Sequence, residues 1–195
     1  MTRYLFPFLL ALPFSQLLAQ KTSFEDRLKN YETKMEDVSF LIGDWADHSF
    51  TYDPKSETWV DFQAKKGGKT VVRNTKITTL ERVRGQAWSI AGKLNLEGFL
   101  SYDVWQGTYR LVLVNDYLGL IDVYEGDFEG NKLVLSNRGP GTYYTRNEKK
   151  MFVRMDFEKT EKGWSLSLLS SSEKEPTWRA GFKANFFPKG AEPTN

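Results

Sequence analysis

The residues best suited to acid–base chemistry are gathered in one segment of the chain. Its carboxylates lie on adjacent predicted strands and the turns between them: Asp103, Asp116, Asp122, Glu125 and Asp127. Two carboxylates in one cavity can divide the roles of acid and base when burial moves their pKa values apart. Asp103, Asp116 and the phenol of Tyr102 are therefore the candidate catalytic residues. The interpretation we prefer is plainer: these acids cap turns or pair with Lys and Arg, because an isolated set of carboxylates is not a catalytic motif.

Composition excludes several other chemistries. The chain has no cysteine, which rules out disulfides, thiolate metal sites and cysteine nucleophiles. Its single histidine, His48, rules out a multi-histidine metal site within one chain. Lys plus Arg is 27 and Asp plus Glu is 25, so the net charge is +2 and there is no global footprint for nucleic acid. We therefore predict no metal, no cofactor and no nucleic-acid partner.

Aromatic residues favour an apolar lumen. The chain has six tryptophans among 195 residues, a length that suggests one domain. For each tryptophan alone, core filling is the simpler interpretation, but together they make a cavity for an apolar or flat ligand plausible. The predicted ligand-binding residues are Trp88, Tyr102, Trp105, Tyr109 and Trp178.

Four arginines fall in the middle of predicted strands: Arg73, Arg110, Arg154 and Arg179. An inward arginine would pair with a carboxylate, including that of a ligand. A solvent-facing position is the preferred interpretation for each one. If Trp178 and Phe182 line the lumen, Arg179 faces outward, because successive strand residues alternate between faces.

The first 19 residues have the three regions of a secretory signal peptide. Arg3 supplies the basic start, Tyr4 to Phe14 is almost unbroken apolar sequence, and Ala19 is the expected last residue before cleavage. The alternative is a membrane anchor, but the apolar run is shorter than the roughly 20 residues a span requires. We expect a secreted or periplasmic protein with no stable membrane insertion after cleavage.

Residues 20–40 are predicted to hold an amphipathic helix that runs from about Ser23 to Val38. A capping box at Thr22 and Glu25 would begin it. The apolar residues that follow recur at spacings of three and four: Phe24, Leu28, Tyr31, Met35 and Val38. This stripe is expected to pack on the same domain rather than on a partner.

Residues 41–188 are expected to be all-β. Runs rich in Val, Ile, Thr and aromatic residues are separated by glycines, most of them 9 to 18 residues apart, as in an antiparallel sandwich or barrel. No proline occurs between Pro54 and Pro140, which favours strands bonded on both sides, as in a closed barrel. The last strand alternates apolar and polar residues, with Trp178, Ala180, Phe182, Ala184 and Phe186 on one side. Residues 189–195 are expected to form a flexible tail.

Gly43 and Trp45 open the first predicted strand directly after the helix. This Gly-x-Trp start resembles that of the calycin superfamily, which includes lipocalins, fatty-acid-binding proteins and nitrobindins. The resemblance implies an up-and-down antiparallel barrel of about ten strands, in which the glycine permits the turn into the first strand and the tryptophan closes one end. Residues 41–188 also resemble an uncharacterised family of exported bacterial lipocalin-like domains. That resemblance is strongest over 98–128, where Tyr102-Asp103, Tyr109, Asp116 and Glu125-Gly126 stand at the family's characteristic places.

Nitrobindins bind haem through a histidine late in the chain, and this sequence has no histidine after His48. Haem is therefore not expected. The preferred function is binding of a small apolar or amphipathic molecule in the barrel. The alternatives are an isomerase, cyclase or lyase that uses lumen carboxylates, and a cell-envelope interaction module with a filled barrel.

Overall fold

The computed structural model describes residues 22–61, 73–80, 85–90, 96–115 and 120–191. It contains one α-helix, a short 3₁₀-helix and a sheet of twelve strands. The helices are α1 (Phe24–Asp37) and η1 (Ser39–Leu41). The strands are β1 (Gly43–Asp53), β2 (Thr58–Asp61), β3 (Arg73–Leu80), β4 (Gly85–Ile90), β5 (Leu96–Asp103), β6 (Thr108–Asn115), β7 (Leu120–Glu129), β8 (Lys132–Ser136), β9 (Tyr144–Arg146), β10 (Lys149–Thr160), β11 (Gly163–Ser172) and β12 (Arg179–Pro188).

Helix α1 begins one residue later than the sequence prediction. Ser23 is the N-cap: its Oγ accepts from the backbone N–H of Asp26 at 3.0 Å, and the Asp26 carboxylate accepts from the Ser23 N–H at 3.3 Å. The predicted box at Thr22 and Glu25 is therefore wrong by one position. Any hydroxyl followed three residues later by an acid satisfies the pattern, and here two such pairs overlap.

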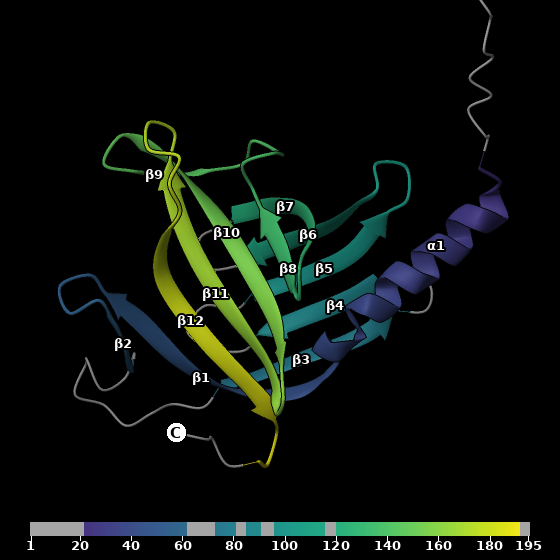
Figure 1. Cartoon of the computed structure of the whole chain (residues 1–195), viewed down its shortest axis with the longest axis horizontal. Helices are drawn as coiled ribbons and strands as arrows, with labels where there is room; N and C mark the ends of the chain where they lie inside the picture. The colour runs from purple at the N-terminus through teal and green to yellow at the C-terminus, as the bar shows by residue number, and fades with distance from the viewer. Residues whose placement is uncertain (1–21, 62–72, 81–84, 91–95, 116–119, 192–195) are drawn as a thin grey trace, which may run out of the picture.

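The sheet is antiparallel throughout its described pairings. Its strand order is β11-β12-β1-β3-β4-β5-β6-β7-β8-β10-β9, with β2 paired to β1 and an additional pairing between β10 and β11. Neighbours in sequence are mostly neighbours in the sheet, as short links require. Figure 1 shows β10, β11 and β12 passing in front of β3–β6, with α1 on the right beside β5.

One face of the sheet, here called the core face, carries the hydrophobic core. Trp164, Tyr109 and Phe157 are fully buried on it, and Trp164 stacks on Phe186 with ring centroids 3.7 Å apart. The opposite side of the sheet is called the outer face. The side chains of Tyr31 and Met35 in α1 pack against the core, and Val38, the residue directly after α1, is fully buried in it, whereas Phe24 remains 77% exposed. The predicted apolar stripe therefore docks through its C-terminal half only.

The strands have two distinct ends. The helix end holds η1, the start of β1 and the hairpins β5–β6, β7–β8 and β10–β11; the far end holds the β9–β10 turn and the β11–β12 loop. At the helix end, Trp45 Nε1 donates to the carbonyl of Leu41 at 2.8 Å, and its ring meets Trp164 edge to face. Gly43 has φ 151°, and a Cβ there would come within 3.1 Å of the Trp45 ring. Both residues thus pack where helix and sheet meet.

No helix in the described part of the chain is long and apolar enough to cross a membrane.

Near the C-terminus, the backbone N–H of Lys189 donates to Asp44 O at 3.0 Å and that of Ala191 donates to Pro188 O at 3.0 Å. The chain therefore continues to pack on β1 for a short distance beyond β12. The predicted signal peptide, residues 1–19, lies outside the described residues.

Candidate functional site

The core face changes character along β10, β11 and β12. Phe157 on β10 and Trp164 on β11, both toward the helix end, are completely buried. Toward the far end the same face carries apolar side chains that stay partly exposed: Met151, Val153, Leu168 and Phe182. The core face is therefore sealed at the helix end and accessible to solvent at the far end.

A pocket of about 290 Å³ opens at this far end. We call it the rim pocket. Its lining includes Arg146, Lys149, Met151, Ser170, Ser172 and Arg179. Met151 and Ser172 are directly opposed in the β10–β11 pairing, two positions beyond Val153 and Ser170. The rim pocket thus adjoins the accessible part of the core face and is lined by cations and hydroxyls.

Glu175 supplies the negative charge in the lining of the rim pocket. Its carboxylate pairs with Arg179 at 2.7 Å. Its backbone is held by Ser172, whose Oγ accepts from the Glu175 N–H at 3.0 Å and whose own N–H donates to the Glu175 carbonyl at 3.1 Å. The side chains of Arg146 and Lys149 make no hydrogen bond or ion pair with any other residue in the described parts of the chain. Two cations therefore remain available to a ligand.

Two predicted ligand-binding residues, Tyr102 and Tyr109, lie on the core face at the helix end. Their rings meet edge to face, with centroids 4.9 Å apart. Tyr109 is fully buried, and its hydroxyl donates to the carbonyl of Lys34 in α1 at 2.7 Å. Burial raises the pKa of the Tyr109 phenol, with a further contribution from the negative charge of Asp37. These tyrosines anchor α1 and are remote from the accessible part of the core face.

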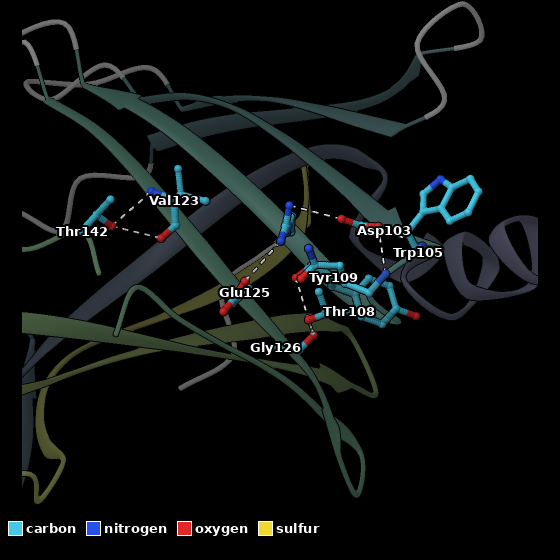
Figure 2. Close-up of polar contacts among 10 residues, drawn as sticks. Asp103, Trp105, Thr108, Tyr109, Val123, Glu125, Gly126 and Thr142 are labelled. Carbon is cyan, nitrogen blue, oxygen red and sulfur yellow. Dashed lines mark hydrogen bonds and ion pairs between the residues drawn. The ribbon is translucent and has the colours of Figure 1, made fainter. Parts of the chain in front are cut away.

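The prediction that Trp105 lines the lumen is wrong. Trp105 lies in the β5–β6 turn and is 77% exposed. Figure 2 shows its ring projecting away from the sheet beside α1. The Arg27 guanidinium lies 4.0 Å from its ring centroid. A hairpin turn points its side chains past the end of the sheet, so alternation along β5 gives no information about this residue.

The prediction that Trp178 lines the lumen is also wrong. The β11–β12 pairing shifts register between Leu168 and Leu169, which opposes Phe182 to Leu168 and Ala180 to Leu169. Such a bulge inserts an extra residue and reverses which face the following side chains occupy. Trp178 therefore lies on the outer face, where the Arg138 guanidinium is 5.3 Å from its ring and 4.7 Å from that of Phe152.

Asp103 has a structural role on the outer face. Its Oδ1 accepts from the backbone N–H groups of Trp105 at 2.9 Å and Gln106 at 3.1 Å, which caps the β5–β6 turn (Figure 2). Its Oδ2 pairs with Arg110 at 3.2 Å, and Arg110 lies 3.6 Å from Glu125. The turn-capping interpretation thus describes Asp103. Asp116 lies outside the described residues, as does the side chain of Trp88, whose backbone pairs with Ile77 and Gly98.

Two polar residues that the sequence analysis missed are buried on the core face. Asp47 is 1% exposed and Ser49 is 8% exposed, and the Ser49 hydroxyl donates to Asp47 Oδ2 at 2.6 Å. Asp47 lies opposite Phe186 and Ser49 opposite Ala184 in the β1–β12 pairing. The signal was present in the sequence, since Trp45, Asp47 and Ser49 share one face of a strand.

A partly buried contact between a phenol and an acid lies on β7. The Tyr124 hydroxyl donates to Asp122 Oδ2 at 3.1 Å, and Tyr124 is 3% exposed. Burial raises the pKa of Tyr124, and the negative charge of Asp122 raises it further. The phenol therefore stays protonated at neutral pH and serves as a donor.

His48 pairs with Asp61 of β2, with Nε2 and Oδ2 2.5 Å apart. His48 alternates with Asp47 and Ser49, which places it on the outer face. Among the described residues, no group of three or more His, Asp or Glu side chains is placed to hold a metal ion.

Comparison with known proteins supports the fold alone. No protein-family model matches the sequence, and no curated protein matches it. The structure is similar to the crystal structure of Rv2717c from M. tuberculosis, with a TM-score of 0.54 and 15% sequence identity. The match covers 80% of this chain and 97% of that chain. The two proteins share a mostly antiparallel β architecture.

Proposed function

We propose that this protein is an exported small-molecule-binding protein that holds an apolar or amphipathic ligand on its core face, entered from the far end. The observation that carries the proposal is the change in exposure along β10, β11 and β12. Leu168 and Phe182 are opposed apolar side chains on the core face that remain partly open to solvent. An accessible concave apolar surface with a few polar groups is the usual form of a ligand site.

The strand pairings support a closed barrel of the calycin type. From β11 the path of pairings runs through β12, β1 and β3 to β8 and β10, and β10 pairs again with β11. A sheet whose path returns to its starting strand encloses its core face. The Gly43-x-Trp45 start and the preceding helix agree with the resemblance to lipocalin-like domains.

Export is the remaining part of the proposal. Its support is the basic start, apolar run and small-residue ending of residues 1–19. Absence of cysteine is compatible with a bacterial periplasm or exterior.

A ligand screen with a paired set of variants tests the binding proposal. Fatty acids, sterols, isoprenoids and flat aromatics are screened by thermal shift and tryptophan fluorescence. A ligand at a hundredfold excess over Kd stabilises the folded state by about 2.7 kcal/mol. Leu168→Trp should abolish the shift because it fills the accessible part of the core face.

Ser167→Trp is the matched control, since Ser167 precedes Leu168 and alternates to the outer face opposite Asp156. It should leave binding intact. Equal loss of binding in both variants would contradict a site on the core face. A crystal structure whose enclosed face is completely filled, with no compound shifting the melting temperature, would overturn the proposal in favour of an interaction module.

A further inference from the structure

We propose that the rim pocket binds an oxyanion, a carboxylate or a phosphate, through Arg146 and Lys149. If the oxyanion is the head group of an amphipathic ligand, the inference rests on the proposed binding function and names the polar part of that ligand. If the oxyanion belongs to a small free molecule, the inference does not depend on the proposed function.

The first argument is the placement of the two cations. Arg146 ends β9 and Lys149 begins β10, and the two are directly opposite each other in the antiparallel pairing. Like charges directly opposite on neighbouring strands destabilise a sheet. Neither cation has an acidic partner in the described parts of the chain. An anion bound between them would remove this repulsion.

The second argument is the turn that holds them together. Asn147 has φ 50° and Glu148 has φ 61°, so both central residues adopt the left-handed region. Asparagine tolerates this conformation, but it is unfavourable for glutamate. The hairpin therefore carries strain at the place where it brings two cations to the edge of a pocket. Strain of this kind is concentrated at ligand-binding sites.

The third argument is the donor content of the pocket. Three cations, Arg146, Lys149 and Arg179, face one carboxylate, Glu175, which Arg179 already pairs. The remaining polar lining is neutral: Asn147, Ser170, Ser171, Ser172 and Thr177. Guanidinium and ammonium groups form short, charge-assisted hydrogen bonds to carboxylate and phosphate oxygens. The uncompensated charge of the pocket lining is thus positive.

The test compares three probes: dodecyl phosphate, propyl phosphate and dodecanol. Affinities are measured by calorimetry at low ionic strength for the wild type and for the double variant Arg146→Gln/Lys149→Gln. The control is Lys159→Gln/Lys162→Gln, which removes the same charge at the helix end from two exposed residues. Loss of one charge-assisted hydrogen bond corresponds to about a tenfold loss of affinity.

We expect phosphate binding to weaken at least tenfold in the rim variant and to be unchanged in the control. Binding of propyl phosphate identifies a free oxyanion as a ligand, whereas binding of dodecyl phosphate alone identifies the head of a chain-bearing ligand. Without ligand, the rim variant should melt no lower than the wild type, because it relieves a like-charge pair. That readout separates loss of binding from loss of folding.

The inference is overturned if dodecyl phosphate and dodecanol bind equally well and the rim variant changes neither affinity. That result leaves the binding function standing, since the chain still binds. Absence of phosphate binding by the wild type also overturns the inference. The screen with Leu168→Trp then decides the binding function separately.

Discussion

The same strands form a tightly packed aromatic core at the helix end of the sheet and a partly exposed pocket at its far end. At the helix end, Trp164, Phe186 and Tyr109 are buried and packed ring against ring beneath α1 and η1. At the far end, the core face ends in serines, partly exposed apolar side chains and a pocket bordered by cations. The helix end therefore contributes most of the favourable free energy of folding. The far end contributes less, and it carries the polar and strained features.

This division has a physical basis. Burial of large aromatic side chains contributes several kcal/mol for each residue, whereas small hydroxyl side chains such as those of the far-end serines contribute little. A like-charge pair and a left-handed glutamate each reduce stability, and a protein retains them only where the rest of the fold compensates. Changes at the two ends should therefore differ in size and in sign.

The largest expected effect is at Trp164. Trp164→Ala should lower the free energy of unfolding by about 3–5 kcal/mol, because it leaves a cavity beneath Phe186 and Trp45. Trp45→Ala should cost less, since Trp45 is only partly buried. Ser170→Ala in the rim pocket should cost less than about 0.5 kcal/mol. Denaturant unfolding measures all three, and similar losses at Trp164 and Ser170 would contradict the proposed division.

An intermediate effect is expected at alkaline pH. The pKa values of Tyr109 and Tyr124 are raised in the folded protein above the ordinary value of 10.0 because both phenols are buried. In the unfolded chain both phenols ionise near pH 10, while in the folded chain they remain protonated. Their contribution is thus complete below pH 10 and is lost as the pH rises above it, by up to about 1.4 kcal/mol per pH unit for each phenol.

Unfolding free energies measured between pH 9 and 11 check this expectation. The decline should be shallower in Tyr124→Phe and in Tyr109→Phe than in the wild type. Tyr143→Phe is the control, since it keeps both buried phenols and replaces a residue that is 45% exposed. Identical slopes in all four proteins would show that neither buried phenol controls the alkaline transition.

The sequence predicted more of the fold than of the site. Strand content, the helix and the junction of Gly43 with Trp45 follow from local pattern, because period and capping are local properties. The β-bulge near Leu168 is a tertiary feature, and it moves Trp178 to the outer face against the alternation of its own strand. The rim pocket was missed for a related reason. Arg146 and Lys149 lie three residues apart, and only the turn between them places them opposite each other.

A small gain in stability is expected from a change at Glu148, opposite in sign to the effects of the changes at the helix end. Glycine adopts φ 61° without the steric cost that a glutamate side chain incurs, and glycine after asparagine is the preferred sequence for a two-residue hairpin turn of this kind. Glu148→Gly should therefore raise the free energy of unfolding by about 0.5–1 kcal/mol. Asn147→Gly is the matched control and should change stability less, because asparagine already tolerates the left-handed region. Thermal and denaturant unfolding of both variants measure the difference. A loss of stability in Glu148→Gly would mean that the glutamate side chain compensates for the conformation by interacting with neighbouring cations. The charged residues of the β9–β10 hairpin would then stabilise the far end of the sheet, contrary to the destabilising role argued above.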